Sequence, residues 1–166
     1  MQISDGKGDA HLVKFTPGIY EGADNLKKLL SDPSRAKIFH FARFDVSAIK
    51  FYLGVDIENI YCTKIASKLV RTYTDKHGLK DLCKEFLNVE ISKQQQCSNW
   101  GAEKLTKEQI DYAASDVLYL HGIREKLNFL LEKENRKAVA QKCFDFVPVR
   151  SELDLGGWHD LDIFHH

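Results

Sequence analysis

Short apolar runs alternate with helical segments in the middle of the chain, and this alternation restricts the fold more than any other feature. Residues 37–41 (KIFHF) are an apolar run that predicts a strand, and residues 44–53 continue as a helix that Gly54 ends. Residues 60–62 predict another strand, and residues 63–72 predict another helix. Chains with this order of elements fold into α/β layers, so we expect helices packed on a mixed sheet.

The outer parts of the chain add one more strand and several helices. Thr106 and Gln109 match the capping box T-x-x-Q, which marks the start of a helix, and Pro148 is expected to end the last helix. The other predicted elements are a strand at 10–15 and helices at 24–30, 78–87, 106–132 and 136–146. Because the chain has no repeats and no flexible linker, residues 1–150 are predicted to form one domain, followed by a tail at 151–166.

Composition and charge exclude several classes of protein. Of the 166 residues, 43% are hydrophobic and 29% are charged, which is typical of a globular domain and not of a disordered chain. No apolar stretch is long enough to span a membrane and no signal peptide is recognisable, so we expect a cytoplasmic protein without a membrane partner. The formal net charge of zero argues against a protein that coats long duplex DNA, but it allows a small pocket for a short oligonucleotide.

Asp45 lies where an apolar strand is predicted to give way to a helix. In α/β folds this junction, at the carboxyl end of a strand, is a common place for functional groups. A structural reading is equally open, since an aspartate in the first turn of a helix is stabilised by the helix dipole and Arg43 could be its surface partner.

Tyr112 and Asp116 lie four residues apart in the predicted long helix and therefore share one face. Apolar residues beside that face indicate a partly buried position, and a buried carboxylate needs a partner. A divalent cation would be such a partner, and the phenol could then position a water molecule beside it. The alternative is an ordinary pair of tyrosine and aspartate on the helix surface.

Two segments, HFARFD at 40–45 and YAASD at 112–116, together resemble the second and third motifs of the ribonuclease D branch of the DEDDy 3′–5′ exonucleases. Intervening residues strengthen the resemblance. Gly78, Leu79 and Leu82 are similar to the G-L-x-x-L helix of that family, and the run from Lys93 to Leu105 is similar to its K…S-D-W…L segment. The short length is most similar to the nano-RNase C-type members, which act on very short RNA and form ring-shaped oligomers.

The resemblance implies an RNase H-like (DnaQ-like exonuclease) α/β fold, with a mixed sheet flanked by helices. It also implies hydrolysis of short single-stranded RNA, with DNA left open, by a mechanism that uses two Mg²⁺ or Mn²⁺ ions. Asp116 would bind metal, Asp45 would hold the second ion, and Tyr112 would orient the attacking water. The residues expected near the substrate are His40, Arg43 and Lys93, which meet it through polar or charged groups, and Phe44 or Trp100, which could stack on a base. A position in the core is the alternative for Trp100.

One part of the family pattern is missing. The first motif, D-x-E on the opening strand, should precede a strand like Met1–Ser4, so it is expected upstream of Met1. From this we expect a sheet that lacks its first strand, an incomplete metal site and little activity. The alternative is a non-catalytic nucleic-acid-binding or assembly protein with the same fold. The apolar tail at 153–164 would suit a contact in a homo-oligomer, although docking on its own domain is equally open.

Overall fold

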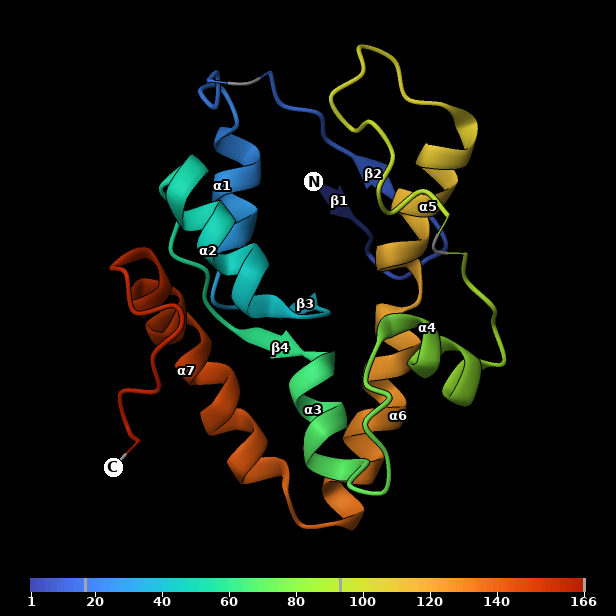
Figure 1. The fold of residues 1–166 in the computed structure, drawn as a ribbon, viewed down its shortest axis with the longest axis vertical. Coiled ribbons are helices and arrows are strands. Elements are labelled where there is room, and N and C mark those ends of the chain that lie inside the picture. Colours follow the sequence, from blue (N-terminus) through green and yellow to red (C-terminus); the bar gives the residue numbers. More distant parts are fainter. Residues whose placement is uncertain (17, 93, 166) are drawn as a thin grey trace.

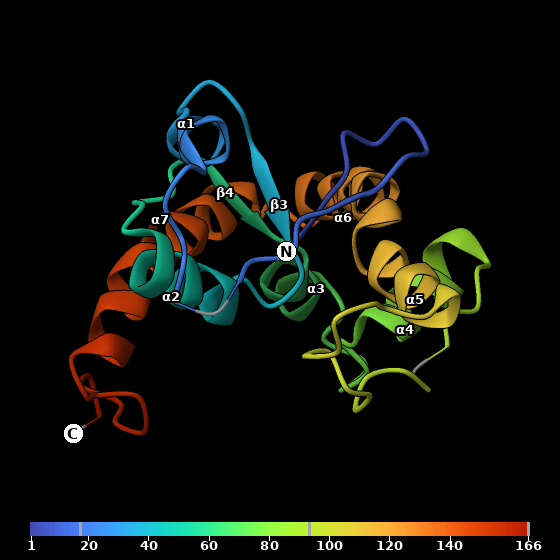
Figure 2. The same ribbon diagram turned by 90° about the horizontal axis from the view of Figure 1, so that it is seen from above.

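The computed structural model describes residues 1–16, 18–92 and 94–165, and Figures 1 and 2 show how its elements are arranged. In chain order these are β1 (Gln2–Ile3), β2 (His11–Leu12), α1 (Asp24–Ser31), β3 (Lys37–Phe39), α2 (Ala42–Leu53), β4 (Ile60–Cys62), α3 (Thr63–Val70), α4 (Leu79–Leu82), the π-helical turn η1 (Cys83–Leu87), α5 (Lys107–Leu118), α6 (Leu120–Lys133) and α7 (Lys137–Leu155). None of these helices is both long enough and apolar enough to cross a membrane.

The strands form two separate pairs within the described residues. β3 and β4 run parallel, with Ile38 opposite Tyr61, while β1 and β2 run antiparallel, with Gln2 opposite Leu12. The parallel pair confirms the predicted alternation, because the crossover between its two strands is the helix α2. In the antiparallel pair, a glycine-containing hairpin turn between residues 4 and 10 joins the two strands, and β2 is shorter than the predicted strand at 10–15.

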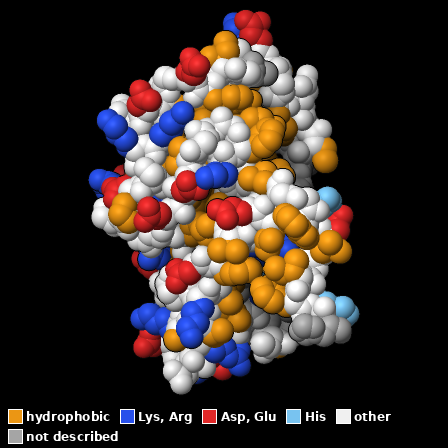
Figure 3. Space-filling view, turned by 90° about the vertical axis from the view of Figure 1, so that its left-hand side faces the viewer, with side chains coloured by type: hydrophobic (Ala, Val, Ile, Leu, Met, Phe, Trp, Pro, Cys, Tyr) orange, Lys and Arg blue, Asp and Glu red, His pale blue; other side chains and the backbone are white. Residues whose placement is uncertain are grey.

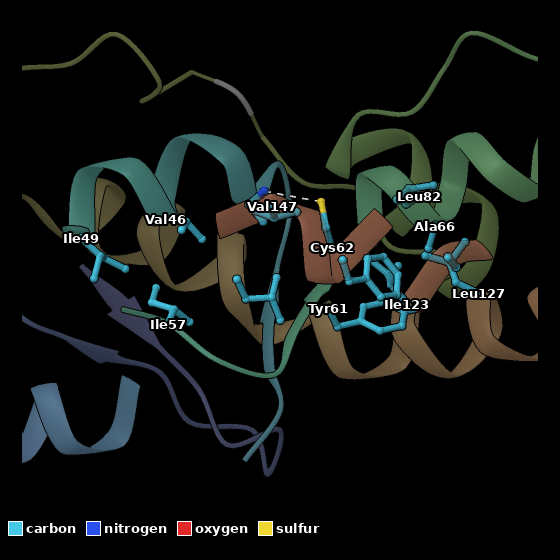
Figure 4. Packing of buried hydrophobic residues seen from close by; sticks show 14 of the residues in the cluster. Val46, Ile49, Ile57, Tyr61, Cys62, Ala66, Leu82, Ile123, Leu127 and Val147 are labelled. Carbon is cyan, nitrogen blue, oxygen red and sulfur yellow. Dashed lines mark hydrogen bonds between the residues drawn. The ribbon is translucent and has the colours of Figure 1, made fainter. Parts of the chain in front are cut away.

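The hydrophobic core surrounds β4 (Figure 4). Tyr61 and Cys62 of β4 are buried against helices on both sides, among them α6, which contributes Ile123 and Leu127 with none of their surface exposed. The backbone N–H of Ala42 donates to the Sγ atom of Cys62 at 3.4 Å. This contact fixes the start of α2 against β4 and so determines where the first turn of α2 lies.

Two helix predictions were wrong. The helix predicted at 106–132 is divided at Tyr119 into α5 and α6, and the last helix continues past Pro148 to Leu155. Proline removes one backbone hydrogen bond from α7. Burial of Val147 and Ser151 on either side of Pro148 offsets that loss, because packing can hold a helix together where its own hydrogen bonding is interrupted.

Candidate active site

A cavity of about 1090 Å³ lies between the two strand pairs. Residues of β1, β2 and β3 line it, so both strand pairs face the same space. Helices α2 and α5 contribute further walls, and Figure 2 shows α2 and α5 on opposite sides of the central strands. Five of the residues predicted from the sequence to serve the site line this cavity: His40, Phe44, Asp45, Tyr112 and Asp116.

Asp45 and Asp116 come from different parts of the chain and both line the cavity. Burial raises the pKa of Asp45 to about 6, and the negative charge of Asp116 adds to this effect. Burial likewise raises the pKa of Asp116 to about 6. The positive amino terminus of Met1 partly offsets the shift of Asp45. Both carboxylates therefore lie in an environment that disfavours their negative charge.

Within the described ranges, no ion pair joins either carboxylate to a lysine or arginine side chain. Two half-buried acids without a cationic partner fit a hard divalent cation, since Mg²⁺ is commonly held by one or two carboxylates together with water and substrate phosphates. The described part of the chain contains no cluster of three or more histidine, cysteine or acidic side chains able to enclose a metal ion. Asp45 and Asp116 could thus hold such an ion only with help from other oxygen ligands.

Tyr112 lies one helical turn before Asp116 on α5, as predicted. Burial and the nearby charge of Asp116 raise the pKa of its phenol above the ordinary value, so the hydroxyl stays protonated at neutral pH and can donate a hydrogen bond. The ring of Trp100 packs against that of Tyr112 with centroids 5.9 Å apart. The structure therefore places Trp100 beside the site, although it is not part of the cavity wall.

His40 is held in one orientation at the end of β3. The hydroxyl of Thr63 donates to the backbone carbonyl of Phe39 at 3.1 Å, and its oxygen lies 2.9 Å from Nδ1 of His40. Because the hydroxyl hydrogen is used on Phe39, Nδ1 of His40 must carry the proton and donate to Thr63. Burial lowers the pKa of His40 to about 4, and the charge of Lys64 contributes to this. The imidazole is therefore neutral at pH 7, with Nε2 able to accept a hydrogen bond.

Phe41 precedes α2 in a left-handed backbone conformation, with φ of 71°. For a residue other than glycine this conformation costs about 1–2 kcal/mol. The ring is 47% exposed, and the Nζ atom of Lys64 lies 4.1 Å from its centroid. An exposed cation–π contact contributes only about 0.5–1 kcal/mol. The contact with Lys64 therefore does not fully offset the backbone strain.

Two predicted substrate residues are placed differently from the others. Arg43 donates two hydrogen bonds to the carboxylate of Asp154 on α7, at 2.6 and 2.7 Å, and a third to the backbone carbonyl of His159. Its guanidinium is thus engaged by the C-terminal part of the chain and does not line the cavity. Lys93 lies outside the described residues.

The cavity also contains residues that sequence reasoning missed. His121 lines it and packs over Gly6 so closely that a Cβ atom at Gly6 would lie 2.7 Å from the imidazole. In one continuous helix, His121 would point about 140° away from Asp116. The break at Tyr119 redirects it, and no sequence periodicity predicts that change. Cys83 is also close to the acids, because the charge of Asp116 adds to burial in raising its pKa to about 11.

Comparison with known protein families gives one model match over most of the chain. A family described as 3′–5′ exonuclease matches residues 1–132. Ribonuclease D of Granulibacter bethesdensis is 35% identical over 111 residues, which covers 67% of this chain and 28% of that protein. The exosome complex exonuclease RRP6 of Saccharomyces cerevisiae is 30% identical over 158 residues, which covers 90% of this chain and 21% of that protein. The chain thus spans less than a third of the length of these curated relatives.

Among solved structures, Brucella melitensis NrnC superposes with a TM-score of 0.96 and is 53% identical, with 99% of this chain and 80% of that chain covered. The same protein with bound Mg²⁺ has a TM-score of 0.94 at 51% identity, covering 99% of this chain and 80% of the other. Bound to pGG, it has a TM-score of 0.95 at 52% identity, covering 99% and 79%.

Proposed function

The chain belongs to the 3′–5′ exonuclease family, and from this premise we propose that it removes nucleotides from the 3′ end of short single-stranded RNA. One observation carries the proposal. Asp45 lies some seventy residues before Tyr112 and Asp116 in the sequence, yet all three line one cavity in which both carboxylates have a raised pKa. Acids with perturbed pKa values that share a cavity are typical of active sites.

Asp45 and Asp116 would hold Mg²⁺ or Mn²⁺, two ions in the complete site, which would polarise the scissile phosphodiester and lower the pKa of a bound water. The protein residues have separate tasks. The protonated hydroxyl of Tyr112 orients the water by donating a hydrogen bond, and it does not act as a base because its pKa is raised. Neutral His40 accepts a hydrogen bond through Nε2, as from a ribose hydroxyl, and does not pair with phosphate.

Short oligonucleotides are the substrates that the cavity suits. The relative NrnC has been solved with pGG, and the zero net charge of this chain offers little electrostatic attraction for long nucleic acids. Phe44 is 70% exposed at the cavity and Trp100 packs on Tyr112, so both can offer a ring to a base. We place this activity in the cytoplasm.

We also propose that the 166-residue chain alone is a weak enzyme. Among the residues that the structure describes, the acids that line the cavity are Asp5, Asp45 and Asp116, and Asp5 already pairs with Lys7. Two acids without a cationic partner therefore stand where the family pattern has four. An added strand that carries D-x-E and occupies the space between β1 and β3 would supply the missing oxygens. If they were never supplied, the chain would be a binding protein, which is the second candidate function.

We also propose that the protein forms homo-oligomers. Figure 3 views the side of the molecule on which α2 and α7 lie in Figure 1, and hydrophobic side chains form a broad patch there. Exposed hydrophobic residues on these two helices include Phe51, Tyr52, Phe146 and Val149. A patch of this kind is commonly buried against another protein molecule.

The decisive experiment is hydrolysis of 5′-labelled pGpG with Mn²⁺ at high protein concentration, with and without a synthetic D-x-E strand peptide. We expect slow cleavage by the chain and faster cleavage with the peptide. Asp116→Asn should reduce the rate by at least about a thousandfold, since it removes the charge that holds the metal. Asp111→Asn is the matched control, because Asp111 is an exposed acid on the same helix that pairs with Lys107. Binding of pGpG without any cleavage would favour the non-catalytic candidate, and an active Asp116→Asn variant would contradict the site.

A further inference from the structure

The pair formed by Phe41 and Lys64 is not explained by folding alone. Phe41 occupies a left-handed conformation that glycine adopts without strain, and yet it leaves a large ring 47% exposed. Lys64 covers part of that ring from a distance of 4.1 Å, but the contact does not fully offset the strain. Strained residues that persist in this way cluster at functional sites.

The position of the pair relates it to the candidate active site. Phe41 does not line the cavity, but its neighbours His40 and Phe44 do. The backbone N–H of Phe44 donates to the carbonyl of Phe41 at 3.2 Å, which ties the first turn of α2 to the strained residue. Lys64 directly follows Thr63, whose hydroxyl oxygen lies 2.9 Å from Nδ1 of His40. Phe41 and Lys64 therefore lie just outside the residues that line the cavity, a position called its rim below, beside the turn that carries Asp45.

We propose that Phe41 and Lys64 form a nucleotide subsite at this rim, in which the ring of Phe41 stacks on a base and Lys64 contacts the phosphate of the same nucleotide. This inference rests on the proposed function. If the 3′ nucleotide enters the cavity and the scissile phosphate lies at the two acids, the preceding nucleotide lies at the rim. The subsite thus binds the base on the 5′ side of the cleaved bond. An aromatic ring next to a cation suits single-stranded nucleic acid, because every base has a face that can stack.

The test uses dinucleotides with a 5′ phosphate and 2-aminopurine at either the 5′ or the 3′ base, with Ca²⁺ in place of Mg²⁺ to slow hydrolysis. Stacking on an aromatic ring quenches 2-aminopurine fluorescence. We expect Phe41→Leu to lose quenching of the 5′ probe, to retain quenching of the 3′ probe, and to bind about tenfold more weakly. Phe41→Trp should restore both quenching and affinity. Phe129→Leu, which changes an exposed phenylalanine on α6 that does not line the cavity, is the matched control and should bind normally.

Phe41→Gly separates a binding role from a structural one. Glycine removes the ring and also relieves the left-handed strain, so this variant should melt at a higher temperature than the unaltered chain and still lose quenching of the 5′ probe. Lys64→Gln should lower the slope of log affinity against log salt by about 0.7, the value for one phosphate contact with a single strand.

The outcomes distinguish this inference from the proposed function. If the unaltered chain binds neither probe, both are overturned. If it binds and quenches them while Phe41→Leu does so equally well, the rim subsite alone is overturned. The rim subsite is also overturned if affinity simply follows melting temperature across the Phe41 variants, because that pattern would indicate a purely structural role.

Discussion

The two sides of the cavity differ in how firmly they are packed. The β3–β4 half, which comprises β3, β4, α2, α3, α6 and α7, contains Cys62, Ile123 and Leu127 with at most 1% of their surface exposed. The β1–β2 half, which comprises β1, β2 and α5, has strand residues that are only half-buried or exposed. Its strands rest on α5, and that helix buries few residues of its own.

The candidate site takes one acid from each half. Asp45 belongs to α2, which is anchored in the core through Ala42 and Cys62, whereas Asp116 belongs to α5. Regions with few buried apolar contacts open at a lower free energy than the global unfolding reaction. Local opening of the β1–β2 half would thus separate the two acids while the β3–β4 half remained folded.

The largest change in the free energy of unfolding should come from a substitution in the core. Leu127→Ala leaves a cavity in the β3–β4 half and should lower the free energy of unfolding by about 2–5 kcal/mol. Leu12→Ala in β2 should cost less than about 1 kcal/mol, because that side chain is only partly buried. Urea unfolding of both variants measures the difference. Equal losses would show that the two halves are packed alike.

A smaller change in the free energy of unfolding, of opposite sign, should come from Asp45, which lines the cavity between the halves. Its pKa is about 6 in the folded protein and near 3.8 in the unfolded chain, so the folded state binds the proton more tightly. The contribution of Asp45 to stability is therefore most favourable below about pH 4, falls as the pH rises to about 6, and is constant above that.

Asp45→Asn removes the loss of stability that the charged carboxylate causes at high pH. Without divalent cations it should stabilise the protein by about 1–2 kcal/mol at pH 7.5, with no gain at pH 4. Thermal unfolding of both proteins at several pH values measures the difference between them, in which shifts from groups that do not interact with Asp45 cancel. A variant that is less stable at pH 7.5 would contradict the raised pKa of Asp45.

The smallest change in the free energy of unfolding should come from a substitution at the start of α5. Thr106 and Gln109 form both hydrogen bonds of a capping box, so Thr106→Ala should cost about 1 kcal/mol. If the two halves open separately, amide exchange should accelerate in α5, β1 and β2 and stay unchanged in β4. Lys107→Ala is the control, since this exposed neighbour makes no cap. Uniform acceleration across the chain would instead indicate that both halves unfold together.

Much of the local structure was predictable because it depends on neighbours in the sequence. The capping box at Thr106, the helix end at Gly54 and the strands on either side of α2 are confirmed. The family and the α/β fold class are confirmed as well, since paired motifs around Asp45 and Asp116 are specific enough to identify relatives. The catalytic roles of these residues remain predictions.

Long-range contacts could not be predicted in the same way. Arg43 was expected to meet substrate, but Asp154, far along the chain, engages its guanidinium. The helix break at Tyr119 and the passage of α7 through Pro148 likewise depend on packing against other elements. Sequence periodicity does not contain these partners, so the two helix predictions were wrong where a distant contact decided the local conformation, while the substrate role of Arg43 stays a prediction.

The sequence by itself determined the order of strands and helices and which acids could serve chemistry, because periodicity, capping and motif spacing are local properties. The tertiary structure alone decided that Asp45 and Asp116 line one cavity, that burial raises both pKa values while the charge of Asp116 raises that of Asp45 further, and that Phe41 stays strained at the rim. The physical reason is that burial and electrostatic interaction depend on distances in space between groups that the sequence holds some seventy residues apart.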